Sequence, residues 1–282
     1  MGRQENIEIF KNTEYQVKNI KSLKEAVTNS TNNQKLYLEN ETFPKVEKNR
    51  FQVKAQIVVS KKRTLQAALA YKNEKVCVHN FASATNPGGG VLKGSGAQEE
   101  CLCRCSTLYF NLSCNDMFDK FYTPHRKEKN PIHNDDCIYT PDVVVFKTDT
   151  NSPKNMQEKD WYKVNVITCA APNLRPNPTN MMNESDGDKQ VELSDDKLYE
   201  LHVSRLRRIL DVALLNNNDV IVLGAFGCGA FRNNPNVVAM AARDVIKDYF
   251  YSFKAIEFAV YCLPRDNSNY KIFEKTIQEI NL

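Results

Sequence analysis

The 282-residue sequence has no long apolar run, since no segment approaches the roughly 20 apolar residues that a helix needs to cross a bilayer. Its first ten residues, MGRQENIEIF, also lack the apolar stretch of a secretory signal. From these two absences we expect no membrane association and a cytoplasmic protein, or a nuclear one if the source is eukaryotic.

The sequence also lacks the cysteine pattern of a disulfide-stapled or zinc-binding protein. Its nine cysteines are an odd number, and several lie within apolar or Gly-rich runs, which predicts reduced, buried thiols: Cys77, Cys169, Cys228 and Cys262. The stretch CLCRC at 101–105 does not have the spacing of a zinc site. We therefore expect no metal, and we interpret Cys228 as a small side chain under a loop rather than as a nucleophile.

A strong charge of either sign is missing as well. The formal net charge is +4, with 41% apolar and 26% charged residues and a mean hydropathy of −0.52, which is typical of a globular protein. Residues 1–75 hold 15 Lys and Arg against 8 Asp and Glu, but this excess is scattered along helices and turns. The pattern favours a solvated face over a nucleic-acid groove, so no specific nucleic acid is expected as a partner.

Strand-like and helix-like segments alternate along the chain, which predicts one α/β domain with a mostly parallel sheet. A polar segment at 174–197 reads as a mobile loop or lid. Strands are expected at 55–60, 75–82, 138–147, 163–172, 219–226 and 255–263. Helices are expected at 14–29, 64–73, 97–112 and 195–216, from Pro235 with Asn234 as N-cap, and at 269–280.

Two Gly-rich loops each follow a predicted strand and precede a predicted helix. The first is ATNPGGGVLKGSGAQEE (84–100) and the second is GAFGCGAFRNNP (224–235). Neither matches the Rossmann fingerprint or the Walker loop. Backbone N–H groups and a helix N-terminus at the end of a parallel strand are suited to bind an anion, so the two loops together predict a phosphate-bearing ligand.

The first loop ends in Gln98, Glu99 and Glu100 at the start of a predicted helix. Acidic residues in a first helical turn stabilise the helix dipole, and this is one reading of the pair. The other reading follows from the neighbouring glycines, because a carboxylate that faces a phosphorylated sugar is equipped for acid–base chemistry at a glycosidic bond.

The motif NPGGG, followed after seven residues by QEE, resembles the signature of the microbial-type poly(ADP-ribose) glycohydrolases. The segments LGAFGCGAFRNNP and RQENIEIFKNT are also similar to that family, so the resemblance spans nearly the whole chain. It implies a macrodomain-like three-layer α/β/α fold over residues 1–282. It also implies an N-terminal helical extension, residues 1–50, packed on this single domain.

The resemblance also implies roles for individual residues. Glu100, the second glutamate of QEE, would be the catalytic acid, and Glu99 would hold ribose hydroxyls. Substrate-binding residues would come from both loops, namely Asn86, Gly88, Gly89, Gly90, Gln98, Gly224, Gly227, Cys228, Gly229, Ala230 and Phe231. Within this set Asn86 and Phe231 would contact the terminal ribose, and Gly227 to Ala230 would wrap the diphosphate.

The activity implied is that of a glycosidase that reverses ADP-ribosylation by cleaving ribose–ribose O-glycosidic bonds. Glu100 would protonate the leaving oxygen and then deprotonate a water, without metal or other cofactor. The substrate would be poly(ADP-ribose) or ADP-ribosylated proteins, and ADP-ribose the product. Because the chain shows no equivalent of the long accessory region of the large animal enzymes, we expect cleavage from the chain end. We also expect the protein to be a monomer.

Two other functions use the same loops. A macrodomain-like pocket can bind ADP-ribose without cleaving it, although such a reader would not need the glutamate pair. A mono-ADP-ribosyl hydrolase would use the pair on a protein or nucleic-acid conjugate, and only a comparison of substrates separates that activity from polymer cleavage.

Overall fold

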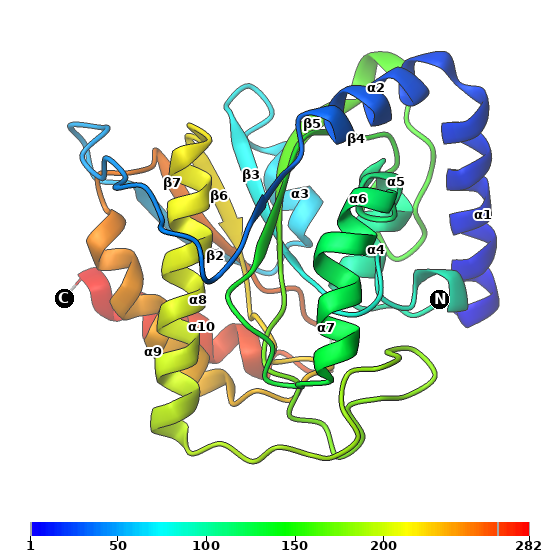
Figure 1. Cartoon of the computed structure of the whole chain (residues 1–282). Coiled ribbons are helices and arrows are strands. Elements are labelled where there is room, and N and C mark those ends of the chain that lie inside the picture. The colour runs from blue at the N-terminus through cyan, green and yellow to red at the C-terminus, as the bar shows by residue number, and fades with distance from the viewer. Residues whose placement is uncertain (1, 264, 282) are drawn as a thin grey trace.

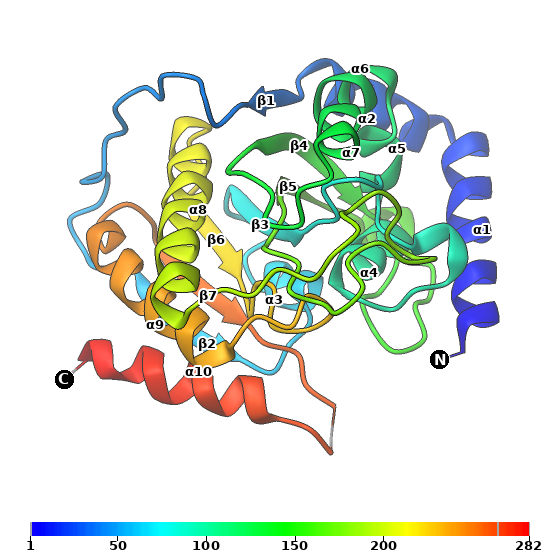
Figure 2. The ribbon, with the colours of Figure 1, turned by 60° about the horizontal axis from the view of Figure 1, so that its bottom comes forward.

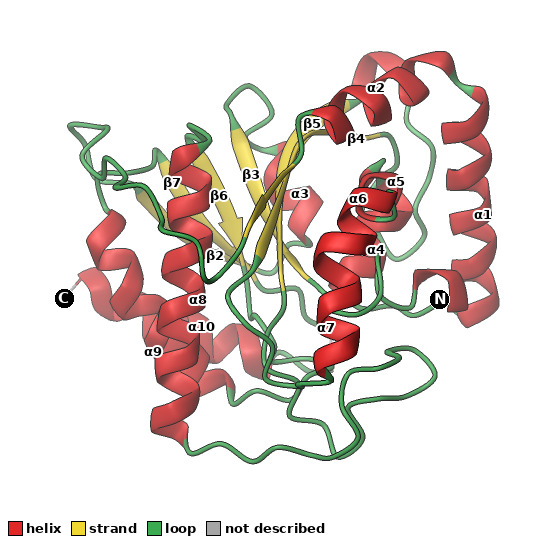
Figure 3. Cartoon of the chain, viewed as in Figure 1, coloured by secondary structure: helices red, strands yellow, loops and turns green. Residues whose placement is uncertain are grey.

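The computed structural model describes residues 2–263 and 265–281, which form one β-sheet with helices on both faces (Figures 1 and 3). In this part of the chain the sheet has seven strands in the order β1-β4-β5-β3-β6-β7-β2. The pairs β5–β3, β3–β6, β6–β7 and β7–β2 are parallel, whereas β1–β4 and β4–β5 are antiparallel. The predicted three-layer fold with a mixed, mostly parallel sheet is confirmed.

The strands coincide with the six that the sequence predicts, plus one short edge strand. The central strands form because continuous apolar runs are buried on both faces, and every residue of β6 and β7 is buried. The edge strand β1 has only three half-buried or exposed residues and no detectable sequence pattern. The strands are β1 (Lys35–Tyr37), β2 (Gln56–Ser60), β3 (Val76–Phe81), β4 (Cys137–Val145), β5 (Tyr162–Cys169), β6 (Val220–Leu223) and β7 (Ala255–Ala259).

Helices from the second half of the chain cover one face of the sheet. They are α8 (Asp195–Leu215), α9 (Pro235–Ile246) and α10 (Ser268–Gln278). The Asn234 side chain accepts a hydrogen bond from the amide of Asn236, which confirms the predicted N-cap of α9. Apolar residues of these three helices, such as Ile209, Val238 and Phe273, pack against the sheet in one core cluster.

Helices from the first half of the chain cover the opposite face. They are α3 (Thr64–Leu69), α4 (Gln98–Cys105), α5 (Leu108–Leu112), α6 (Asn115–Met117) and α7 (Thr123–Glu128), with a π-helical turn at Phe118–Tyr122. Leu65, Leu102 and Phe121 belong to the core cluster on this face. Short 3₁₀ turns lie at Val91–Lys93, Glu158–Asp160, Lys247–Tyr249 and Glu279–Asn281.

The N-terminal segment forms two helices, so the prediction of one helix over 14–29 is wrong. Helix α1 spans Arg3–Asn19 and α2 spans Lys21–Asn32, with Ile20 in an extended conformation between them. The buried face of α1 includes Asn6 and Thr13, and these polar residues interrupt the apolar stripe that would have revealed its first half.

The predicted helix over 97–112 is also wrong, because it breaks at Ser106. That residue is extended and forms an isolated bridge with Val145. Its hydroxyl donates to the carbonyl of Leu102 and accepts the amide of Leu108, which satisfies backbone groups on both sides of the break.

Helix α1 lies beside the first Gly-rich loop and α4. The side chain of Asn6 donates to the carbonyl of Gly94 at 3.0 Å, and the hydroxyl of Thr13 donates to that of Arg104 at 2.6 Å. The buried ammonium of Lys147 donates to the carbonyl of Ile9 at 2.9 Å. Within residues 1–50 the helices end at Asn32, and β1 follows. None of the helices in residues 2–263 and 265–281 is long and apolar enough to span a membrane.

Candidate active site

A pocket of about 410 Å³ opens at the carboxyl ends of the parallel strands. This edge of the sheet faces down in Figure 1 and comes forward in Figure 2. Because the carboxyl ends of parallel strands meet at one edge, the segments that follow five different strands form its walls. Thr64 follows β2, Ser83 and Gly89 follow β3, Ala171 follows β5, Gly227 follows β6 and Tyr261 follows β7.

The first Gly-rich loop passes directly over the two glutamates. Gly89 has a φ of +59°, and a Cβ atom there would lie 2.6 Å from Oε1 of Glu100 and 3.0 Å from Oε2 of Glu99. Only glycine allows both this backbone conformation and this close approach. The NPGGG motif therefore has a steric reason to precede QEE: the chain must fold back onto its own carboxylates.

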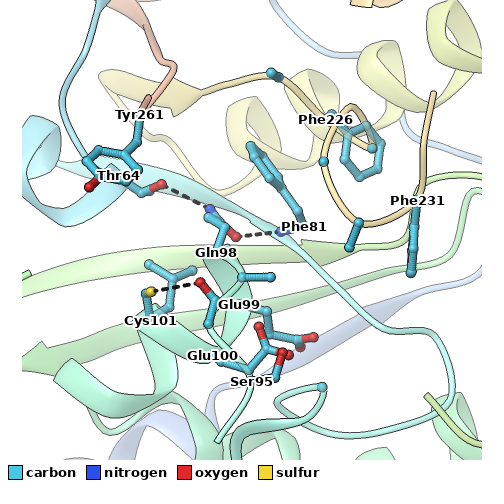
Figure 4. A pocket seen from close by; sticks show the side chains of 18 of the residues that line it. Thr64, Phe81, Ser95, Gln98, Glu99, Glu100, Cys101, Phe226, Phe231 and Tyr261 are labelled. Atoms are coloured by element: carbon cyan, nitrogen blue, oxygen red, sulfur yellow. Dashed lines mark hydrogen bonds between the residues drawn. The ribbon is translucent and has the colours of Figure 1, made fainter. Parts of the chain in front are cut away.

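Glu100 is fixed by one oxygen only. Its Oε1 accepts the backbone N–H of Gly90 at 2.9 Å, and its Oε2 has no hydrogen-bond partner among the described residues. The side chain is 6% exposed and lies at the base of the pocket with Glu99 (Figure 4). A carboxyl group with one anchored and one unpaired oxygen can be positioned and still exchange a proton.

Glu99 is held at both oxygens. Oε1 accepts from Nδ2 of Asn80 at 3.2 Å, and Oε2 accepts from the amide of Ser83 at 2.8 Å. Burial raises the pKa of Glu99 well above its usual value, and the neighbouring Glu100 raises it further, while the hydrogen bonds from Ser83, Asn80 and Gly88 oppose this rise. The carboxylate pair thus shares one buried site with unequal surroundings.

Gln98 lines the same pocket, but its amide group is already occupied. Its Oε1 accepts the amide of Phe81, and its Nε2 donates to Thr64 Oγ1 and to the carbonyl of His79 (Figure 4). The side chain thereby ties the first turn of α4 to β3 and α3, and so fixes the direction in which the two glutamates point.

Asn86 and Gly88 take part in the loop but do not line the pocket. The Oδ1 of Asn86 accepts from Nη2 of Arg126 at 2.9 Å, and Arg126 also donates to the carbonyl of Thr85. Gly88 packs against Tyr109 and Cys103. Arg126 lies on α7, in a segment for which the sequence predicts no element, so this support for the loop had no sequence signal.

The second Gly-rich loop forms the opposite wall. Gly227 has a φ of +75°, and its position would bring a Cβ within 2.8 Å of the Ala171 side chain. The amides of Gly229, Ala230 and Phe231 have no acceptor within the described part of the chain. Phe231 and Phe226 lie on the side of the pocket opposite Tyr261 (Figure 4). Free amides beside a strand end form the kind of cradle that binds an anion.

Two residues predicted in this loop do not line the pocket. A Cβ on Gly224 would meet the carbonyl of Ala259 and the ring of Phe81, so this glycine allows close packing between β6 and β7. Cys228 is half-buried and its Sγ lies 3.6 Å from the carbonyl of Phe226. Burial raises the pKa of the Cys228 thiol, which is the opposite of what a nucleophile requires.

The segment 174–197, predicted as a loop or lid, contributes to the pocket wall through Arg175, Met182 and Asn183. The Oδ1 of Asn183 accepts the hydroxyl of Ser83 at 2.6 Å. At its base, His133 Nε2 lies 2.7 Å from Asp186 Oδ1, and Asn173 donates to Asp186 Oδ2 at 2.5 Å. Sequence reasoning missed these contacts because they join residues far apart in the chain.

The cysteines do not form a metal site. No group of three or more His, Cys, Asp or Glu side chains in residues 2–263 and 265–281 is arranged to hold a metal ion. All nine cysteines are free thiols. Cys77 and Cys169 are buried as predicted, whereas Cys228 and Cys262 are half-buried, which corrects that part of the prediction.

Several solved structures have the same overall fold as this chain. The X-ray crystal structure of poly(ADP-ribose) glycohydrolase (PARG) from Thermomonospora curvata aligns with a TM-score of 0.81 and 25% identity, covering 97% of this chain and 99% of that one. The same enzyme bound to the inhibitor ADP-HPD gives 0.79 and 25%, covering 96% and 99%. PARG from Deinococcus radiodurans in complex with ADP-ribose gives 0.73 and 26%, covering 91% and 98%. No curated protein sequence matches the chain.

The fold, the pocket between two Gly-rich loops and these structural neighbours define the class of the protein: it is a glycoside hydrolase of the PARG type. The family model described as "Microbial-type PARG, catalytic domain" matches residues 3–148, a stretch that contains both the NPGGG motif and QEE. The chain belongs to this microbial-type PARG family.

Proposed function

We propose that the chain hydrolyses the ribose–ribose O-glycosidic bond of poly(ADP-ribose) from the chain end and releases ADP-ribose, with Glu100 as general acid and base. The observation that carries the role of Glu100 is its asymmetry, since Gly90 anchors Oε1 while Oε2 has no partner in the described structure. In this proposal Oε2 carries the proton that the leaving group needs.

The proposed reaction has two proton transfers. Protonated Glu100 gives its proton to the glycosidic oxygen as the bond from that oxygen to the anomeric carbon breaks, and the bonding electrons leave with the oxygen. Positive charge develops on the ribose ring. A water then attacks the anomeric carbon and gives a proton to the Glu100 carboxylate, which restores the acid. Glu99, held by Ser83 and Asn80, would accept hydrogen bonds from ribose hydroxyls.

The rest of the ligand would follow the pocket walls. The diphosphate would lie against the free amides of Gly229, Ala230 and Phe231, with Phe231 also packing against the terminal ribose. Phe226 and Tyr261 offer aromatic surface for the adenosine end. Gln98, Asn86, Gly88, Gly224 and Cys228 would act by holding the two loops rather than by contacting the substrate.

A pocket of about 410 Å³ is the size of a site for a single small ligand, and this supports cleavage from the end of a polymer. We also propose that residues 1–282 act as one monomeric unit, with residues 1–50 as an extension that supports the first loop through Asn6. A cytoplasmic location stays a prediction.

The experiment that tests the proposal compares wild type with Glu100→Gln on radiolabelled poly(ADP-ribose). We expect wild type to release ADP-ribose from the first turnovers without oligomers of intermediate length, and Glu100→Gln to release none while it still binds ADP-ribose in calorimetry. The exposed Glu158→Gln is the matched control and should cleave as wild type does.

Three results would contradict parts of the proposal. A wild-type rate in Glu100→Gln would remove Glu100 from the mechanism, and early oligomers of intermediate length would indicate internal cleavage. Intact polymer, despite binding of ADP-ribose and removal of single ADP-ribosyl groups from a modified protein, would indicate a mono-ADP-ribosyl hydrolase.

A further inference from the structure

Three acidic and two basic side chains line the pocket, and the two basic ones differ in how they are engaged. Glu99, Glu100 and Asp149 are acidic, and Arg63 and Arg175 are basic. A diphosphate that enters this pocket brings negative charge, which a cation that is free to face the ligand would stabilise.

Arg63 is already engaged by other groups. Its Nη1 lies 3.9 Å from Oδ1 of Asp149, and its Nη2 donates to Oδ1 of Asn151 at 2.6 Å. The guanidinium also lies over the ring of Tyr261, 4.0 Å from the ring centroid. Its charge is therefore shared with a carboxylate, and its donors are used within the protein.

Arg175 differs from Arg63 in this respect. Arg175 also lines the pocket. Within residues 2–263 and 265–281, however, its guanidinium has no acidic partner within 4.0 Å and no hydrogen-bond acceptor. Arg175 is half-buried, and among the described residues that line the pocket it is the cation whose donors are uncommitted. Arginine is suited to this task because its planar group can bind two phosphate oxygens at once.

The backbone places Arg175 beside the second Gly-rich loop. The amide of Leu174 donates to the carbonyl of Phe231 at 3.0 Å, and the amide of Arg175 itself donates to Oδ1 of Asn173. Asn173 is fixed in turn by the amide contact to Pro131 and by Asp186. The backbone at Arg175 is therefore held on both sides, by the contact of Leu174 with Phe231 and by Asn173.

We propose that Arg175 binds the diphosphate of the ligand and supplies positive charge that stabilises its phosphate oxygens. This inference rests on the proposed function, because it takes ADP-ribose as the ligand. It adds a side chain to a cradle that otherwise consists of backbone amides, and it places that side chain on the polar segment 174–197 rather than on either Gly-rich loop.

The test measures the binding of ADP-ribose and of adenosine by calorimetry for wild type, Arg175→Gln and Arg175→Lys. We expect Arg175→Gln to weaken ADP-ribose binding by about 10- to 100-fold, the range of a charge-assisted contact, and to leave adenosine binding unchanged. Arg175→Lys keeps the charge and should lose less. The affinity of Arg175→Gln should also depend less steeply on salt than that of wild type.

Arg232→Gln is the matched control, since Arg232 is exposed on the same loop system and does not line the pocket. It should bind ADP-ribose as wild type does. Equal ADP-ribose affinity in Arg175→Gln and wild type would overturn the inference, and so would an equal loss for adenosine, which would indicate a structural role. If wild type itself failed to bind ADP-ribose, the proposed function would fail. If wild type bound and cleaved normally and Arg175→Gln bound ADP-ribose equally well, only the role of Arg175 would be lost.

Discussion

Gly89 and Glu100 approach each other so closely that a single methyl group between them would displace the carboxyl group: a Cβ on Gly89 would lie 2.6 Å from Oε1 of Glu100. The same oxygen accepts the amide of Gly90. The first loop and the proposed catalytic acid are therefore one steric unit, and the geometry of the acid can be tested through the loop without changing the acid itself.

Gly89→Ala is expected to reduce turnover by at least about 100-fold, because small displacements of a catalytic group have effects of that size. The change also places an alanine at a φ of +59°. Gly2→Ala is the matched control, since Gly2 does not line the pocket and a Cβ there meets nothing within 4 Å, and its turnover should stay within about twofold of wild type. Normal turnover in Gly89→Ala, measured on poly(ADP-ribose), would show that the carboxyl position does not limit the reaction.

Glu99→Gln should change how stability depends on pH. The pKa of Glu99 is raised in the folded protein by burial and by Glu100, so the folded state binds more protons than the unfolded state above the ordinary value of 4.5. Wild type therefore loses the stability contributed by protonated Glu99 as pH rises through the pKa of Glu99 in the folded protein, and the variant does not. The Tm of the variant minus that of wild type should increase with pH, whereas a constant difference would argue against the raised pKa.

Lys147→Met should show the reverse trend at high pH. Burial lowers the pKa of Lys147 from 10.5 to about 8, so between these values the folded state binds fewer protons than the unfolded state. Wild type gains stability as pH rises across this window, and Lys147→Met does not. In melting experiments from pH 7 to pH 10, the Tm of the variant minus that of wild type should decrease as pH rises. A constant difference would contradict a buried lysine with a lowered pKa.

Asp186→Ala should destabilise the base of the 174–197 segment. The side chains of His133 and Asp186 are 1% and 0% exposed, and removal of one partner of a buried pair costs about 3–5 kcal/mol. We expect a lower Tm and earlier proteolytic cleavage within 174–197. Asp188→Ala removes an exposed aspartate 3.8 Å from Lys129 and should change stability by less than about 0.5 kcal/mol. Equal proteolysis of the two variants would show that the pair does not hold the segment.

The half of the candidate site that carries the two glutamates could be located from the sequence because its residues are contiguous. The strand, the glycines and the glutamates follow one another between Val76 and Glu100, and the steric reason for their spacing lies within that one segment. The sheet could be predicted for a similar reason, since its buried strands are continuous apolar runs. The second loop was recognisable because it repeats the same sequence of strand, glycines and helix.

The remaining contacts depend on residues that meet only in the folded chain. Asn183 accepts from Ser83, and Arg126 supports Asn86, yet nothing in their own neighbourhoods distinguishes these residues from surface polar residues. Helix α1 was half missed because Asn6 and Thr13 use their polar atoms to bind carbonyls of other segments. Periodicity detects apolar faces, and it misses faces that are buried through hydrogen bonds.

The position of β3 at the centre of the sheet also bears on synthesis of the protein. Cys77 pairs with Asn165 and Val76 with Val220, so both neighbours of the strand that precedes the first Gly-rich loop are made long after it. A nascent chain that has just completed Glu100 has no partner strands to bury Glu99. The site therefore assembles late, when the second half of the chain emerges from the ribosome. Until then the exposed edges of β3 can pair with wrong strands, and chaperones would matter most during this interval.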